Sequence, residues 1–81
     1  MKRVLVCDDD ESMREAIEAM LAPEYSVDAV ASGEAALALM QHQDVDVVLL
    51  DVRLPGISGL DVLRIVRENY PLVQCLMISS V

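Results

Sequence analysis

Four short apolar runs alternate along this chain with segments that carry apolar residues at helical spacing. The runs cover residues 4–7, 25–30, 45–50 and 75–78. Runs of this length that are rich in Val, Leu and Ile predict β-strands. In the second run, Ser26 and Asp28 alternate with apolar residues, which predicts an edge strand with one face in water.

The three segments between the runs predict amphipathic helices. They cover residues 11–21, 34–41 and 59–69. Each follows a residue whose side chain can accept hydrogen bonds from the first helical turn, namely Asp10, Ser32 and Ser58. The face predicted to be buried in the first helix carries Met13, Ala16, Ile17, Met20 and Leu21. The corresponding face of the third helix carries Gly59, Val62, Leu63, Val66 and Tyr70.

Strict alternation of strand and helix predicts an α/β fold, in which helices cover both faces of a parallel sheet. The last run, 75–78, is uniformly apolar, and no segment follows that could cover it. An uncovered apolar edge strand invites pairing with another chain, which native proteins normally prevent. We therefore expect that a C-terminal portion of the domain is missing from this sequence.

The composition narrows the class of protein. With 81 residues, the chain has room for one domain, residues 1–81. Its 6 basic and 14 acidic residues give a net charge of −8, which argues against nucleic acid or an anionic membrane as a direct partner. No apolar run approaches the ~20 residues that span a bilayer, and the first run is too short for a secretory signal. Two cysteines are too few for a disulfide framework or a zinc site, so we expect a cytoplasmic protein with reduced thiols.

Carboxylates follow two of the predicted strands. Asp8 and Asp9 come directly after the first strand, and Asp51 follows the third. Ligands of doubly wound sheets bind beyond the carboxyl ends of the strands, so these side chains meet if the two strands are neighbours. Carboxylates that repel one another favour a hard cation, and a set of oxygen ligands suits Mg²⁺, which commonly bridges carboxylates to a phosphate. The alternative is purely structural, since acidic residues also cap the N-terminus of a helix.

Three segments carry acidic and hydroxyl residues in a fixed order. They are Val-Leu-Val-Cys-Asp8-Asp9-Asp10, Val-Val-Leu-Leu-Asp51-Val-Arg-Leu-Pro55-Gly-Ile-Ser-Gly59 and Cys-Leu-Met-Ile-Ser79-Ser80. Together they resemble the receiver domain of two-component response regulators, and the resemblance covers the whole chain. It implies a flavodoxin-like doubly wound parallel sheet with strand order 2-1-3-4, lacking the last strand and the last two helices of the family fold. It also implies a phosphoacceptor domain that is not an enzyme, although it can assist its own phosphorylation and dephosphorylation.

The resemblance assigns roles to the acidic residues. Asp51 matches the aspartate that takes a phosphoryl group from a phosphohistidine on a histidine kinase or a phosphotransfer protein. Asp9 matches the carboxylate that binds Mg²⁺ directly, and Asp8 matches the one that acts mainly through water. Arg53 matches the residue whose backbone carbonyl completes the metal shell. The implied cofactor is therefore Mg²⁺, held by Asp8, Asp9, Asp51 and Arg53.

Two hydroxyl residues also match the family, whereas a lysine does not. Ser79 matches the residue whose hydroxyl binds a phosphoryl oxygen, and Ser80 stands where a small side chain leaves the phosphoryl pocket open. The family carries a lysine on a fifth strand, but the one lysine here is Lys2, at the start of the first strand.

These departures leave alternatives to a working receiver. One is a truncated fragment that is not competent as a switch and acts only as a folding or self-association unit. We expect such self-association through the exposed edge of strand 75–78. Another is a phosphohydrolase with an aspartyl nucleophile, against which no second carboxylate lies two residues after Asp51.

Overall fold

Strands and helices alternate through residues 1–78, the part of the chain that the computed structural model describes. In chain order, the elements are β1 (Arg3–Cys7), α1 (Glu11–Leu21), β2 (Ser26–Val30), α2 (Gly33–Met40), β3 (Val47–Asp51), α3 (Gly59–Asn69) and β4 (Gln74–Ile78). Every boundary lies within two residues of its predicted position, so the alternation predicted from the apolar pattern is confirmed. Asp51, which we expected just beyond the third strand, is the last residue of β3.

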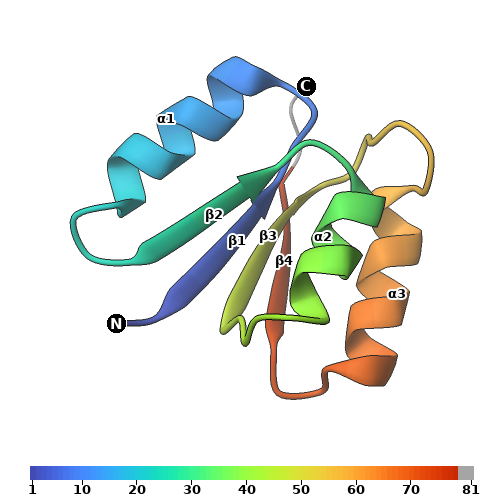
Figure 1. The fold of residues 1–81 in the computed structure, drawn as a ribbon. Coiled ribbons are helices and arrows are strands. Elements are labelled where there is room, and N and C mark those ends of the chain that lie inside the picture. The colour runs from blue at the N-terminus through green and yellow to red at the C-terminus, as the bar shows by residue number, and fades with distance from the viewer. Residues whose placement is uncertain (79–81) are drawn as a thin grey trace.

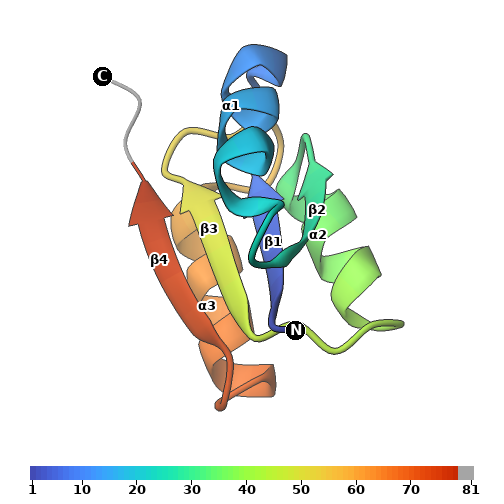
Figure 2. The same cartoon turned by 90° about the vertical axis from the view of Figure 1, so that its left-hand side faces the viewer.

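The four strands form one parallel sheet in the order β2-β1-β3-β4. This confirms the predicted strand order and the flavodoxin-like α/β class. α1 lies on one face of the sheet, and α2 and α3 lie on the other (Figure 1 and Figure 2). The carboxyl ends of β1 and β3 are neighbours, because Cys7 pairs with Leu50. The chain leaves β1 toward one side and β3 toward the other, which creates the switch point where such sheets bind ligands.

The two central strands supply both halves of the core. Successive side chains of a strand point to opposite faces, so neighbouring residues enter different halves. Leu5 and Val48 are fully buried on the side of α2 and α3, whereas Val4 and Val6 pack beside Ile17 of α1. Strands that are buried on both faces give the loops at their carboxyl ends a rigid base.

The buried face of α1 is narrower than predicted. Ile17 is buried, and Met13 and Leu21 pack against the same cluster, but Ala16 is exposed and Met20 is 73% exposed. The prediction that Ala16 and Met20 belong to the core is therefore wrong. Within residues 1–78, α1 contacts only β1 and β2, and a helix above two strands has room for one stripe of side chains spaced by four residues.

β4 forms an edge of the sheet, with Leu76 53% exposed. On the face that carries α1, no helix among the described residues covers β3 or β4 (Figure 2). Leu76 pairs with Leu49 and therefore points to this same face. The result is a partly exposed apolar strip, called here the β3–β4 strip, formed by Val47, Leu49, Leu76 and Ile78. None of the helices in residues 1–78 has the length and apolar character that a bilayer crossing requires.

Candidate functional site

Asp8, Asp9 and Asp51 lie together at the carboxyl end of the sheet. Each offers one carboxylate oxygen, and these three oxygens all lie within 4.8 Å of one another. Asp8 and Asp51 are each only 1% exposed, whereas Asp9 is exposed. The residues are distant in the sequence, and the pairing of β1 with β3 brings them into one acidic cluster.

The segment after β1 turns directly into α1. Asp10 is the N-cap of this helix, as predicted, because its Oδ1 accepts the backbone N–H of Ser12 at 2.9 Å and that of Met13 at 3.4 Å. Asp8 and Asp9 precede the cap, and within the described residues neither side chain accepts an N–H from the first turn of the helix. Capping of the helix N-terminus therefore explains the presence of Asp10 but not that of Asp8 and Asp9.

Asp8 has one carboxylate oxygen engaged and one unengaged. Its Oδ1 accepts the backbone N–H of Asp10 at 2.9 Å, whereas its buried Oδ2 has no hydrogen-bond partner within the described residues. Burial raises the pKa of the Asp8 carboxyl; the Asp10 N–H opposes this, and the charges of Asp51 and Asp9 add to it. A buried oxygen without a partner is unfavourable unless a ligand satisfies it. This atom therefore points to a ligand of the acidic cluster.

Asp51 is oriented by the loop that follows it. Its Oδ1 accepts the backbone N–H of Arg53 at 3.0 Å. Gly56, directly after Pro55, has φ +72°, a left-handed conformation that favours glycine. α3 then begins at Gly59, where a Cβ atom would overlap the carbonyl oxygen of Asp51. The loop can therefore return this close to β3 only because residue 59 has no side chain.

The donor atoms of the acidic cluster suit a hard divalent cation, because they are all carboxylate oxygens. Mg²⁺ binds oxygen in an octahedral shell at about 2.0–2.1 Å, so opposite ligands lie about 4 Å apart. Oxygens within 4.8 Å of one another are compatible with such a shell when water supplies the remaining ligands. Together with the Asp8 Oδ2, which no described residue hydrogen-bonds, the donor set fits the predicted metal.

The other predicted site residues differ in what the structure says of them. Arg53 lies beside Asp51 and contacts it through its backbone N–H, and the metal-binding role of its carbonyl stays a prediction. Ser79 and Ser80 lie outside the described residues, so their predicted roles beside the phosphoryl group also stay predictions.

Sequence reasoning misses two charged residues that contact the segments around the cluster. Arg14 donates from Nη1 to the carbonyl oxygen of Asp8 at 2.8 Å. Glu34 accepts the backbone N–H of Ile57 at 3.0 Å. Arg14 lies one helical turn after Asp10, a spacing that could have drawn attention to it. The partner of Glu34 is 23 residues away in the sequence, and no local sequence pattern predicts the contact.

Cys7 immediately precedes Asp8 but belongs to the core. Its Sγ donates to the carbonyl oxygen of Ser32 at 3.3 Å, and the residue is fully buried. Burial, with the charges of Asp8 and Asp51, raises the pKa of the Cys7 thiol to about 12. Cys7 and Cys75 are both free thiols, as expected, and a thiol that resists ionisation is a poor nucleophile.

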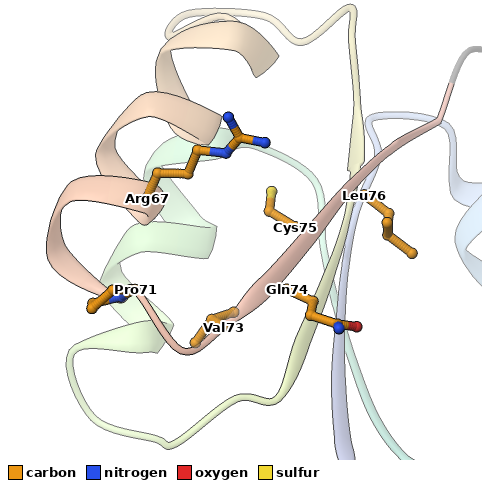
Figure 3. Close-up of a pocket in the computed structure, with 6 residues that line it drawn as sticks. All are labelled: Arg67, Pro71, Val73, Gln74, Cys75 and Leu76. Carbon is orange, nitrogen blue, oxygen red and sulfur yellow. The ribbon is translucent and has the colours of Figure 1, made fainter.

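A separate pocket lies away from the acidic cluster. It has a volume of about 420 Å³ between the end of α3 and the start of β4, with Arg67 and Cys75 on its walls (Figure 3). These residues lie at the amino end of β4, away from the carboxyl ends that carry Asp8 and Asp51. The pocket holds no carboxylate, so it is not part of the acidic cluster.

An open parallel sheet with buried carboxylates at its switch point defines a class of α/β proteins that bind ligands beyond the carboxyl ends of their strands, here with donor atoms that suit a divalent cation. Comparison with known families identifies the particular family within this class. The model of the response regulator receiver domain matches residues 4–81, and the chain belongs to that family. The resemblance stated from the sequence motifs is therefore confirmed.

Known relatives and structures agree with this assignment. Over 77 residues the chain is 40% identical to the hydrogenase transcriptional regulatory protein HoxA of Cupriavidus necator, a match covering 95% of this chain and 16% of HoxA. The response regulator TrrA of Thermotoga maritima, solved in complex with Mg²⁺-BeF, superposes with a TM-score of 0.94 at 34% identity. That match covers 100% of this chain and 71% of TrrA. In the complex of histidine kinase ThkA with TrrA, the match has a TM-score of 0.89 at 34% identity and covers 99% of this chain and 70% of the other.

Proposed function

We propose that this chain is the phosphoacceptor receiver module of a two-component response regulator, and that Asp51 receives the phosphoryl group. The observation that carries the proposal is the buried Asp51 carboxylate beside two further carboxylates, one of which has a buried oxygen without a partner among the residues that the structure describes. TrrA, at 34% identity, was solved with Mg²⁺-BeF and with histidine kinase ThkA. This supports a histidine kinase, or a phosphotransfer protein, as the donor to Asp51.

The carboxylates of Asp8, Asp9 and Asp51, with the backbone carbonyl of Arg53, would hold Mg²⁺. When bound, the cation supplies positive charge that offsets the charge on the phosphoryl oxygens. Asp9, which is exposed, is suited to direct ligation from the solvent side. The resemblance to the family implies that Asp8 acts mainly through water.

Asp51 is suited to act as the nucleophile. The Arg53 N–H holds Oδ1, so the carboxylate is oriented and Oδ2 is the attacking oxygen. A bond forms between Oδ2 and phosphorus while the N–P bond of the phosphohistidine breaks, and its electron pair returns to the imidazole nitrogen. Burial of Asp51 limits the access of water to the acyl phosphate.

The remaining parts of the proposal follow from the resemblance and from charge. The Ser79 hydroxyl donates to a phosphoryl oxygen, and the small side chain of Ser80 keeps the pocket open. The module is a phosphoacceptor and not a free-standing enzyme. Its net charge of −8 favours a protein partner over nucleic acid or an anionic membrane, in a cytoplasmic setting.

Intact-mass measurement after incubation with a small-molecule phosphodonor tests this function. We expect one phosphoryl group per chain in the presence of Mg²⁺, none after removal of Mg²⁺, and none in Asp51→Asn. Asp44→Asn is the matched control, because Asp44 is an exposed carboxylate outside the acidic cluster, and it should be labelled like the wild type. The absence of an adduct, or an adduct that survives Asp51→Asn, contradicts the proposal and favours the fragment alternative.

We further propose that the 81-residue chain self-associates along β4. The β3–β4 strip is apolar and partly exposed, and β4 presents an unpaired edge within the described residues. Exposed apolar edge strands promote pairing between copies.

A further inference from the structure

We propose that Arg14 is a positioning residue for the acidic cluster and that its hydrogen bond to Asp8 sets the affinity of the cluster for Mg²⁺. The inference rests on the proposed function, since it concerns the cation that accompanies phosphoryl transfer. Arg14 lies in α1, is partly buried, and donates from Nη1 to the Asp8 carbonyl oxygen at 2.8 Å. It is placed to act through the backbone of Asp8, without contact to the reacting atoms.

Asp8 is fixed by three hydrogen bonds from different parts of the fold. Its backbone N–H donates to the carbonyl of Val30 at 3.1 Å, its carbonyl accepts from Arg14, and its Oδ1 accepts from Asp10 at 2.9 Å. The Val30 bond extends the sheet, and the Asp10 bond is local to the turn. Of these three bonds, the Arg14 bond is the one made by a residue of α1. Together they fix the direction of Oδ2, which has no hydrogen-bond partner within residues 1–78, so that this oxygen can hold the cation directly or through a bound water.

Arg14 has acidic neighbours on α1 that are alternative partners for its guanidinium. Arg14 lines a small groove of about 170 Å³ with Glu11, Glu15, Glu18 and Ala29. Glu11 and Glu18 lie three and four residues away, the spacings at which helical ion pairs form. Nevertheless, the hydrogen bond that the guanidinium makes is to the Asp8 carbonyl. The surrounding carboxylates also offset the positive charge of Arg14, which limits its repulsion of a cation in the cluster.

A role of Arg14 through its charge and a role through its hydrogen bond predict opposite effects of its removal on Mg²⁺ affinity. If the guanidinium acted only through its charge, its removal would strengthen Mg²⁺ binding, because a nearby positive charge would be gone. If it acts by holding the Asp8 carbonyl, its removal lets the turn move and weakens binding. Partners that orient metal ligands typically change affinity by about 10- to 100-fold when they are lost.

Titration of ¹⁵N-labelled full chain with Mg²⁺, followed by NMR, tests the inference without any phosphorylation. We expect Arg14→Gln and Arg14→Ala to weaken Mg²⁺ binding by about tenfold, the lower end of the range for such partners. We also expect faster hydrogen exchange at the Asp10 amide, whose acceptor is the Asp8 side chain. Gln and Ala are strong helix formers, so α1 should persist in both variants. Arg14→Lys keeps one donor and the charge, and should recover part of the affinity.

Arg64→Gln is the matched control. It removes the same charge from α3, where Arg64 is exposed and pairs with Asp61 at 3.5 Å, and it should leave Mg²⁺ affinity within about twofold of the wild type. Unchanged or tighter Mg²⁺ binding in Arg14→Gln overturns the inference while leaving the proposed function standing. Failure of the wild type itself to bind Mg²⁺ overturns the proposed function and the inference together.

Discussion

Glu34 Oε2 accepts the backbone N–H of Ile57 at 3.0 Å, so the first turn of α2 is tied to the loop that follows Asp51. The contact lies beside the left-handed turn at Gly56, where an added Cβ atom would lie 2.7 Å from the same carboxylate oxygen. The loop that orients Asp51 is thus supported from two sides, by α2 through Glu34 and by the close approach of Gly59 to β3. This arrangement gives an element far from Asp51 in the sequence an influence on the acceptor.

Replacement of Glu34 by Ala should loosen this loop. We expect a loss of about 1 kcal/mol in the free energy of unfolding, since one partly exposed hydrogen bond is removed. The Ile57 amide should also exchange faster with solvent. Urea unfolding and NMR-detected hydrogen exchange measure these changes. Glu34→Gln keeps an acceptor and should lose less, while Glu68→Ala, at an exposed position on α3, is the control. Equal Ile57 exchange rates in Glu34→Ala and wild type contradict the prediction.

Gly59→Ala should destabilise the fold and slow the labelling of Asp51, although alanine favours the helix. Alanine favours a helix over glycine by about 1 kcal/mol, so propensity alone predicts a more stable protein. The added Cβ, however, would overlap the Asp51 carbonyl and force β3 and α3 apart. We expect a net loss of stability of about 1–3 kcal/mol, in the range for overpacking, and slower Mg²⁺-dependent labelling of Asp51. Urea unfolding and intact mass measure the two effects. A more stable Gly59→Ala with normal labelling contradicts this account.

The sequence predicts the elements of this fold well because the signals are local. Apolar runs and N-caps such as Asp10 and Ser58 act within one element, and the structure confirms both caps. The prediction fails for Met20, whose exposure depends on how many strands lie beneath α1. Helical periodicity reports which side of a helix is apolar but not how wide a surface it meets.

The acidic cluster could be predicted only in part for a similar reason. Asp8, Asp9 and Asp51 can be found from the sequence because each stands at the end of an apolar run. The contacts of Arg14 and Glu34 depend on where long side chains reach after the elements have packed, which spacing along the chain does not encode.

Asp8→Asn should stabilise the protein in the absence of divalent cations. The buried Oδ2 of Asp8 lacks a hydrogen-bond partner in the described part of the chain and lies close to like charges, whereas an amide carries no charge and can donate a hydrogen bond. We expect a gain of about 1–2 kcal/mol in the free energy of unfolding at neutral pH with a chelator present, measured with urea. Asp9→Asn is the control, and it should gain less because Asp9 is exposed.

The gain from Asp8→Asn should depend on pH with a defined sign. The pKa of Asp8 in the folded chain is raised above the ordinary value of 3.8, so the folded state keeps this proton at pH values where the unfolded state releases it. The charged carboxylate therefore destabilises the fold above its raised pKa, and this effect disappears as the pH falls to 3.8 and below. Urea unfolding of wild type and Asp8→Asn across this range should show the two converging at low pH. A difference that grows with acidification contradicts the assignment.

Leu76→Lys should disrupt self-association along β4, whereas Leu72→Lys should not. Leu76 is 53% exposed and contributes to the β3–β4 strip, while Leu72 is 95% exposed in the connection before β4 and lies outside the strip. Both substitutions add the same charge to an exposed leucine, so they differ only in location. Burial of a lysine in an apolar interface costs about 3 kcal/mol or more, which raises a dimer dissociation constant by about a hundredfold. Light scattering coupled to size-exclusion chromatography should give a dimer for wild type and Leu72→Lys and a monomer for Leu76→Lys. A wild type that stays monomeric at high concentration rules out self-association, and loss of the dimer in both variants moves the interface away from the β3–β4 strip.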